Sequence, residues 1–203
     1  MTILIVAVVA VVAFLVGSIP FGYLIARFFY HTDIRKSGSG NIGAMNALRT
    51  VGRTAAVAVL LLDAAKGVIP VALCLHALDS ELLASVAAVC AVLGHCLSPW
   101  LGWKGGKGVA TAFGAIFALS WPAGLVIVAV WIIAALGFTR YSSVGSMLGS
   151  LASPFALYAF TRSLPEAAFG VFTAVFILWT HRENIGRLRK GTEGPIRLFQ
   201  RKT

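Results

Sequence analysis

Residues 109–138 form an almost uninterrupted apolar block, about 30 residues long. As one helix it would measure roughly 45 Å, whereas the hydrocarbon core of a bilayer is about 30 Å thick. Trp121 and Pro122 offer a break, because proline is tolerated at the start of a helix but disrupts its interior. The first part, 109–120, would then be only about 18 Å long and would need surrounding protein to be stable in lipid. The block therefore predicts two segments, one of them short or partly re-entrant.

Similar apolar blocks fill most of the remaining chain, at 3–29, 54–78, 82–101, 143–160 and 167–180. The hydrophobic share of the 203 residues is 59%, and only 12% are charged, against about a quarter in soluble domains. This excess is too large for one buried core, so we expect an all-α integral membrane protein. The chain has neither an internal repeat nor a long linker, so residues 1–203 are expected to form a single membrane domain.

The positions of the cations distinguish six spans from seven. With a break at Trp121, one side of the membrane carries the basic tail from residue 181 together with Arg35, Lys36, Arg49, Arg53, Lys104, Lys107 and Arg140. The other side carries Asp79, Glu81, Glu166 and one cation, Arg162. The positive-inside rule then favours seven transmembrane helices, with the N-terminus outside and the C-terminus in the cytoplasm. This rule also explains the net charge of +10 without nucleic acid, because no basic face carries interleaved aromatic residues.

The polar stretch KSGSGNIGAMNALRT, residues 36–50, contains G-x-G-x-x-G at Gly38, Gly40 and Gly43. A dinucleotide-binding turn needs a buried strand before these glycines, but here the polar run YHTDIRKS precedes them. The acid at the expected distance, Asp63, lies inside an apolar block where no ribose could reach it. We therefore interpret the stretch as an anion-binding loop, in which backbone N–H groups converge and Arg49 clamps the anion. A flexible polar turn is the alternative.

The stretch GWKGGKGVAT, residues 102–111, is a second glycine-rich loop. It is not a Walker A loop, because Lys107 is followed by Gly108 and not by Ser or Thr. Two lysines flank Gly105 and Gly106 just before a predicted helix, so backbone amides, helix dipole and ammonium charge could together bind phosphate. The alternative is an ordinary turn whose lysines only follow the positive-inside rule.

Two further groups of polar residues are candidates for function. In HRENIGRLRKG, residues 181–191, His181 and Asn184 are three apart and share a helix face. We interpret the cations of the same stretch, Arg187, Arg189 and Lys190, as membrane-surface charges. Asp63 and Lys66 lie inside an apolar block at a spacing that allows an ion pair, which we favour over a catalytic role, although Lys66 could reach an anionic ligand. His95 fits either a buried hydrogen-bonded residue or a proton carrier.

Taken in order, SGSGNIGAMN, LGHCLSPWLGWKGGKGVAT and HRENIGRL resemble the three signature loops of the bacterial acyl-phosphate:glycerol-3-phosphate acyltransferases, the PlsY family. GSIPFGYLIA, LLLDAAKG and RYSSVGS match as well, so the resemblance covers nearly the whole chain. One departure is Met45, where the family usually has Thr. The resemblance implies transfer of a fatty acyl group from acyl phosphate to the 1-hydroxyl of sn-glycerol 3-phosphate. The products would be lysophosphatidate and phosphate, in the first acylation step of bacterial phospholipid biosynthesis.

The same resemblance implies the site residues. It assigns Ser39, Asn41 and Arg49 to one phosphate and Lys104, Gly105, Gly106 and Lys107 to the other, and it completes the site with Ser143, His181 and Asn184. Ser39, His181 and Asn184 are the catalytic candidates, Lys66 is a further candidate ligand, and Glu183 is expected to be structural. His181 or a phosphate oxygen of the substrate would take the hydroxyl proton. The residues suggest neither a metal nor an organic cofactor.

The resemblance also implies partners and a location. The partners are the two substrates, membrane lipid and an upstream enzyme that forms acyl phosphate. The location is the bacterial cytoplasmic (inner) membrane, with the active site facing the cytoplasm. The rival function is a small anion or metabolite transporter, since broken helices and intramembrane charges suit transport. Against it, no repeat relates two halves of the chain. A lipid phosphotransferase would need a cluster of acidic metal ligands, which Asp33, Asp63, Glu183 and Glu193 do not form.

Overall fold

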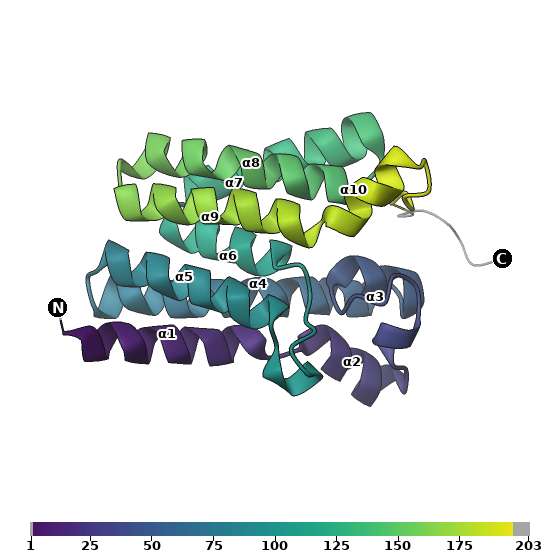
Figure 1. Cartoon of the computed structure of the whole chain (residues 1–203), viewed down its shortest axis with the longest axis horizontal. Coiled ribbons are helices and arrows are strands. Elements are labelled where there is room, and N and C mark those ends of the chain that lie inside the picture. The colour runs from purple at the N-terminus through teal and green to yellow at the C-terminus, as the bar shows by residue number, and fades with distance from the viewer. Residues whose placement is uncertain (1, 197–203) are drawn as a thin grey trace.

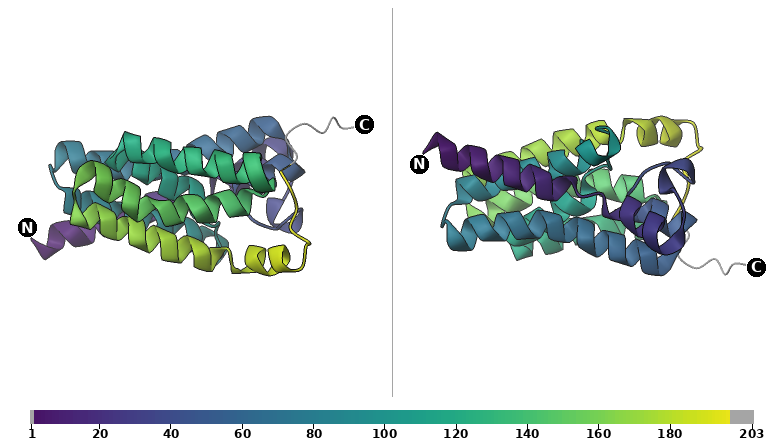
Figure 2. Two further views of the ribbon diagram at one scale, coloured as in Figure 1. Left: turned by 90° about the horizontal axis from the view of Figure 1, so that it is seen from above. Right: turned by 90° about the horizontal axis from the view of Figure 1, so that it is seen from below.

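The computed structural model describes residues 2–196, and this range folds entirely into helices and connecting loops. The longer helices lie side by side along one axis (Figures 1 and 2). In chain order the elements are α1 (Ile3–Ser18), α2 (Phe21–Tyr30), η1 (Ile34–Lys36), α3 (Ala44–Thr50), α4 (Arg53–Ala77), α5 (Glu81–Cys96), η2 (Pro99–Leu101), α6 (Val109–Leu119), α7 (Trp121–Ile132), the π-helical η3 (Ile133–Thr139), α8 (Ser142–Thr161), α9 (Leu164–Thr180) and α10 (Arg182–Arg189).

The expected first span, 3–29, corresponds to one candidate membrane span over Ile3–Tyr30, but two helices make it up. Helix α1 ends at Ser18 and α2 begins at Phe21, because Pro20 has no N–H to donate within a continuous helix. At the break, the carbonyl of Ile19 accepts hydrogen bonds from the Phe21 amide at 3.1 Å and from the ammonium of Lys66, which lies on α4, at 2.9 Å. A buried lysine therefore stabilises the break in the first block.

The predicted break in the long apolar block is confirmed. Helix α6 ends at Leu119 and α7 begins at Trp121, with Pro122 in its first turn. Ser120 lies between them, and its hydroxyl accepts a hydrogen bond of 3.4 Å from the Ala123 amide. Helix α6 has 11 residues, so it is about 16 Å long, and it packs between α4 and α7. A short helix at this depth is stable because protein covers it.

Within the described residues, five helical segments are long and apolar enough to cross a membrane. The bent pair α9 and α10, with an angle of 55° between them, would be a sixth, and α6 is a shorter apolar helix. The structure is thus the expected multi-helix membrane fold, while seven crossings and the orientation of the termini stay predictions.

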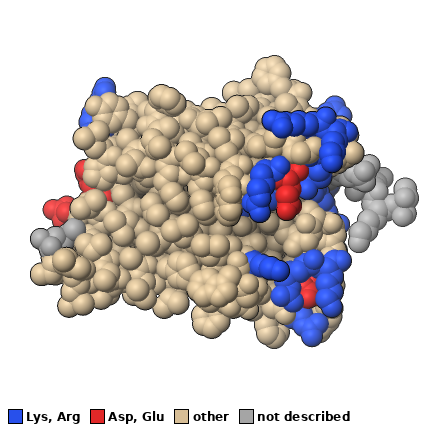
Figure 3. Space-filling view, in the orientation of Figure 1, with Lys and Arg blue, Asp and Glu red and all other residues tan. Residues whose placement is uncertain are grey.

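The polar connections lie in the half of the bundle away from the N-terminus, which we call the basic end. It holds residues 31–52, 97–108, 140–141 and 181–196 (Figure 1). Bonds between distant segments join these parts: Arg49 Nη2 donates to Gly194 O at 3.0 Å, and Ile196 N donates to Arg140 O at 2.8 Å. On the face shown in Figure 3, Lys and Arg side chains cluster at this end, and acidic side chains mark the opposite one. The N-terminus lies at that opposite end (Figures 1 and 2).

Candidate active site

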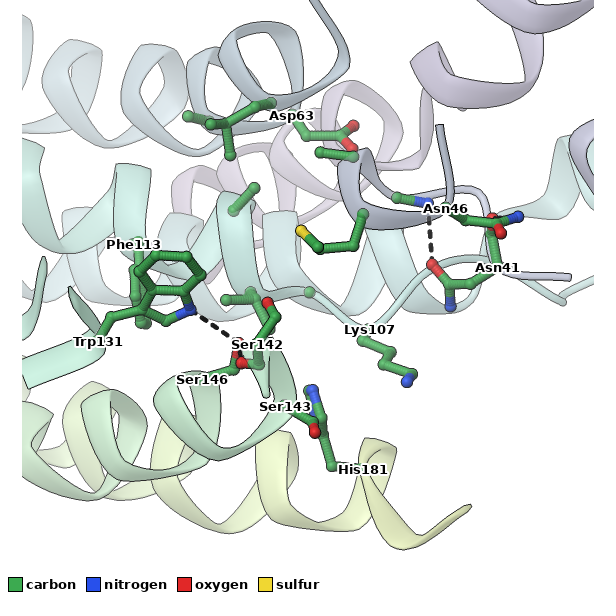
Figure 4. Close-up of a pocket in the computed structure, with 18 of the residues that line it drawn as sticks. Asn41, Asn46, Asp63, Lys107, Phe113, Trp131, Ser142, Ser143, Ser146 and His181 are labelled. Atoms are coloured by element: carbon green, nitrogen blue, oxygen red, sulfur yellow. Dashed lines mark hydrogen bonds between the residues drawn. The ribbon is translucent and has the colours of Figure 1, made fainter. Parts of the chain in front are cut away.

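A cavity of about 640 Å³ opens at the basic end and continues between α4, α6 and α7 (Figure 4). Its outer half is polar and basic, with side chains from the loops, α3, α8 and α10: Ser39, Asn41, Asn46, Arg49, Lys107, Ser142, Ser143, Ser146, His181, Asn184, Arg187 and Glu193. Its inner half is largely apolar, with Leu60, Ala64, Val68, Phe113, Gly114, Phe117, Val128, Trp131 and Ile132, and the buried polar residues Asp63 and His95 also belong to the lining. The cavity can therefore receive a molecule that has an anionic head and a hydrocarbon tail.

The first glycine-rich loop is organised around one buried amide, Asn46. Its Nδ2 donates to the carbonyls of Ile34 at 3.0 Å, Ser37 at 3.0 Å and Asn41 at 2.8 Å, and its Oδ1 accepts from Ser39 N at 2.8 Å. Gly38 and Gly40 have φ of 61° and 70°, which non-glycine residues rarely adopt. The G-x-G-x-x-G pattern is thus explained by loop geometry, which presents Ser39 and Asn41 to the cavity.

The second glycine-rich loop packs on the end of α5. The amide of Gly105 donates to Cys96 O at 2.9 Å, and that of Gly106 donates to His95 O at 3.0 Å. A Cβ at Gly106 would lie 2.0 Å from Nε2 of His95, so the loop needs glycine for its close approach to this ring. The expectation that these two amides bind phosphate does not agree with the structure, because both are already hydrogen-bonded to the protein. Lys107 is the charged residue of this loop that lines the cavity (Figure 4).

Lys107 meets the residues of the third loop across the cavity. Its ammonium donates to Asn184 Oδ1. Burial, reinforced by the nearby Arg187 cation, lowers the pKa of Lys107 to about 8. The side chain is therefore a cation at neutral pH, and a bound anion would offset the cost of its burial.

Glu193 links the third loop to α8, although sequence reasoning gave it no role in the site. Its Oε1 accepts from Ser143 Oγ at 2.7 Å and from Asn184 Nδ2 at 2.6 Å, and its Oε2 accepts from Arg187 Nε at 2.7 Å. Burial opposes ionisation, but these donors outweigh it and lower the pKa of Glu193. Glu193 thus fixes Ser143, Asn184 and Arg187 in place. Arg187 is one of the cations that we expected at the membrane surface, and the structure places it in the cavity wall instead.

His181 lies between α9 and α10 and faces the cavity near Lys107 (Figure 4). Its Nδ1 lies 2.8 Å from the carbonyl oxygen of Ile177, so in the neutral ring Nδ1 carries the proton and Nε2 is the free acceptor. Burial, followed by the charge of Lys107, lowers the pKa of His181 to about 4. The ring is therefore neutral at physiological pH and can accept a hydrogen bond from a substrate hydroxyl.

A second pocket of about 360 Å³ adjoins the cavity at the basic end. The two spaces share Ser39, Asn41, Lys107 and Arg187. The second pocket adds the cations Arg35 and Lys104, and its lining is completed by Gly40, Ile42, Leu101, Gly105 and Glu183. Two basic spaces with a common wall can hold two anions side by side.

Lys66, like Gly106, is a predicted ligand that lines neither pocket. Its ammonium lies 2.9 Å from Asp63 Oδ1 and 2.9 Å from Ile19 O, and the side chains of Lys66 and Asp63 are both 2% exposed. His95 Nδ1 lies 3.7 Å from the same carboxylate oxygen. This arrangement supports the ion pair that we favoured from the spacing, although Asp63, which we expected to be out of reach of a ribose, lines the cavity together with His95.

Residues 7–191 match the protein family described as Glycerol-3-phosphate acyltransferase. The chain is 47% identical over 194 residues to the Glycerol-3-phosphate acyltransferase of Jannaschia sp. (strain CCS1), covering 95% of this chain and 94% of the relative. It is 45% identical over 183 residues to that of Synechococcus sp. (strain JA-3-3Ab), covering 90% and 89%.

Among solved structures, the chain is similar to crystal structures of PlsY (YgiH), an integral membrane glycerol 3-phosphate acyltransferase. The glycerol 3-phosphate form superposes with a TM-score of 0.89 at 35% identity, covering 96% of this chain and 99% of the other. The lysophosphatidic acid form superposes with a TM-score of 0.86 at 34% identity, covering 94% of each chain. By family match, close relatives and fold, this chain belongs to the glycerol-3-phosphate acyltransferase family of integral membrane proteins.

Proposed function

We propose that the protein transfers a fatty acyl group from acyl phosphate to the 1-hydroxyl of sn-glycerol 3-phosphate, releasing phosphate and lysophosphatidate. The observation that carries this proposal is the continuity of the cavity from a basic outer half to an apolar inner half. The inner half suits the acyl tail. The basic spaces suit the phosphate of the donor and the phosphate of the acceptor.

The reaction needs little covalent help from the protein, because acyl phosphate is already an activated mixed anhydride. The 1-hydroxyl oxygen bonds to the carbonyl carbon, the bond from that carbon to the phosphate oxygen breaks, and phosphate leaves. The hydroxyl proton passes to Nε2 of His181 or to a phosphate oxygen. Arg49, Lys107 and Arg187 hold and neutralise the phosphates, and this positioning supplies much of the rate. Ser39, Asn41, Ser143 and Asn184 orient the reacting groups.

The test is acylation by the purified protein. Acyl phosphate and labelled glycerol 3-phosphate are supplied without metal or acyl carrier, and lysophosphatidate and phosphate should form in equal amounts. Acylation from acyl-coenzyme A or acyl carrier protein, with none from acyl phosphate, would refute the proposed donor. Movement of glycerol 3-phosphate into proteoliposomes without any acyl transfer would favour a transporter instead.

We further propose that the basic end faces the cytoplasm of a bacterial inner membrane, with the N-terminus outside. The support is the asymmetry of charge between the two ends of the bundle (Figure 3). Single cysteines at Ser39, Lys104 and Arg140 should be labelled only from the cytoplasmic side. Labelling of one of these sites from the opposite side would refute this orientation.

A further inference from the structure

The depth of the apolar half of the cavity is set along one face of α6. Val109, Ala110, Phe113, Gly114 and Phe117 all line the cavity. Because α6 begins at the basic end and runs away from it, Phe117 is the member of this row that lies deepest (Figure 1). The row extends about 12 Å along the helix. Beyond Phe117 the helix ends at Leu119, and Ser120 turns the chain into α7.

Both phenylalanine rings of this row rest on glycines of neighbouring helices. A Cβ at Gly124 of α7 would lie 2.6 Å from Cγ of Phe117, and a Cβ at Gly149 of α8 would lie 2.9 Å from Cζ of Phe113. Neither distance is tolerated, so any side chain at these positions would displace the ring. The glycines lie behind the rings, and their lack of a side chain leaves each ring room to sit back from the cavity.

We propose that Phe117, seated on Gly124, sets the depth of the acyl-chain pocket and so determines which acyl chain lengths are accepted. The inference rests on the proposed function, since it takes the apolar half of the cavity to hold the tail of the donor. Phe113 lies halfway along the row, and Trp131 of α7 lines the same cavity (Figure 4). Phe117 lies two residues before the end of α6, at the deep end of the row, where the end of an extended chain would meet it.

The position of the ring therefore controls the space left for terminal methylenes. Adding a methyl group at Gly124 should push the ring toward the cavity and shorten the pocket. Trimming Phe117 to a smaller side chain should lengthen it. One methylene more or less in an apolar pocket changes the ratio of kcat/KM values between two substrates by roughly tenfold or more. A displaced Phe117 ring should therefore change the dependence of kcat/KM on acyl-chain length.

The experiment measures kcat/KM for a series of saturated acyl phosphates, from octanoyl to stearoyl, as competing pairs with glycerol 3-phosphate as acceptor. The variants are Gly124→Ala, Phe117→Ala and the double variant Gly124→Ala with Phe117→Leu. The matched control is Gly137→Ala, because Gly137 lies in the continuation of the same helix and a Cβ there would meet nothing within 4 Å.

Gly124→Ala should lower kcat/KM for the longest donors relative to the shortest by about tenfold or more, and the double variant should restore the original profile. Phe117→Ala should shift the preference toward longer donors, and Gly137→Ala should leave the profile unchanged. If Gly124→Ala does not fold, Phe117→Ala decides the question alone. An unchanged profile in an active Phe117→Ala variant would overturn the inference, since it would mean that the chain leaves the cavity sideways into lipid. Absence of acyl transfer with any donor in the unmodified protein would instead refute the proposed function.

Discussion

Two groups of charges in this bundle are arranged differently, one buried among the helices and one partly exposed at the wall of the cavity. In the first, Asp63 pairs with Lys66, and Lys66 also donates to Ile19 O, so the Asp63 carboxylate is neutralised even though it lines the cavity. In the second, Lys107, Arg187 and Glu193 meet at the wall of a cavity, with Arg49 close by and one carboxylate among three cations. The first group is electrically closed and the second leaves positive charge facing an open space. In a membrane protein, a charge that other protein groups do not neutralise therefore indicates a binding site.

Substitution in the Asp63–Lys66 pair should have the largest effect of any variant, and it should lower the stability of the protein. Lys66→Met leaves the Asp63 carboxylate buried without its partner, which costs about 3–5 kcal/mol for pairs of this kind. Thermal unfolding in detergent should show a strongly lowered Tm, with near-normal KM values in whatever protein remains folded. The double variant Asp63→Asn with Lys66→Met should recover part of the loss, because it removes both charges together. A stable Lys66→Met variant with a raised KM would move this pair into the binding site and break the comparison.

Substitutions among the charges at the cavity wall should lower activity and leave stability nearly unchanged. Lys107→Met removes a cation from the cavity wall, so the loss should appear in kcat/KM, with little change in Tm. A charge-assisted hydrogen bond contributes about 1.5–3 kcal/mol, which corresponds to roughly tenfold to more than a hundredfold in affinity. Arg189→Ala is the control, since Arg189 is an exposed cation of the same end that lies outside both pockets. Equal kinetics for the two variants would contradict a binding role for Lys107.

A substitution at Arg49 should have a smaller effect on activity, and it tests whether the shape of the guanidinium matters in addition to its charge. Arg49→Lys keeps the cation, but an ammonium cannot reproduce the planar fork that binds phosphate bidentately. Arg49 also donates to Gly194 O, and lysine would lose this geometry as well. We expect kcat/KM to fall about five- to tenfold, equivalent to one lost hydrogen bond of roughly 1 kcal/mol. Activity equal to that of the unmodified protein would show that Arg49 acts as a simple positive charge.

The smallest effect is a pH dependence. Lys107 has a pKa lowered to about 8, so its anion-binding form is present below that pH and is lost as the pH rises through it. In the free enzyme kcat/KM should therefore decline above about pH 8. Lys107→Arg should move this decline to higher pH, because a guanidinium stays protonated. His181, with a pKa near 4, should contribute no inflection between pH 5 and 8. A decline that Lys107→Arg leaves in place would assign it to another group.

Much of the site could be predicted from the sequence, because its residues lie in short polar loops that an apolar chain can place only at membrane surfaces. The break before Trp121 was visible for a similar reason, since the block was too long for one helix. Glu193 could not be predicted, because it lies in an irregular segment where neither periodicity nor spacing indicates a partner. The occupied amides of Gly105 and Gly106 were also hidden, since their acceptors on α5 depend on tertiary packing. The break at Pro20 was missed because the apolar run continues across it.

The most direct test of two adjoining phosphate pockets is a pair of KM measurements on two variants. Lys104 lines only the second pocket, and Arg49 lines only the main cavity. In detergent-purified, monodisperse protein, KM is measured for acyl phosphate and for glycerol 3-phosphate in Lys104→Met and in Arg49→Ala. The account predicts that each variant raises mainly one KM, and that the two variants affect different substrates. A rise in the same KM for both variants, or equal small changes in all four values, would contradict it.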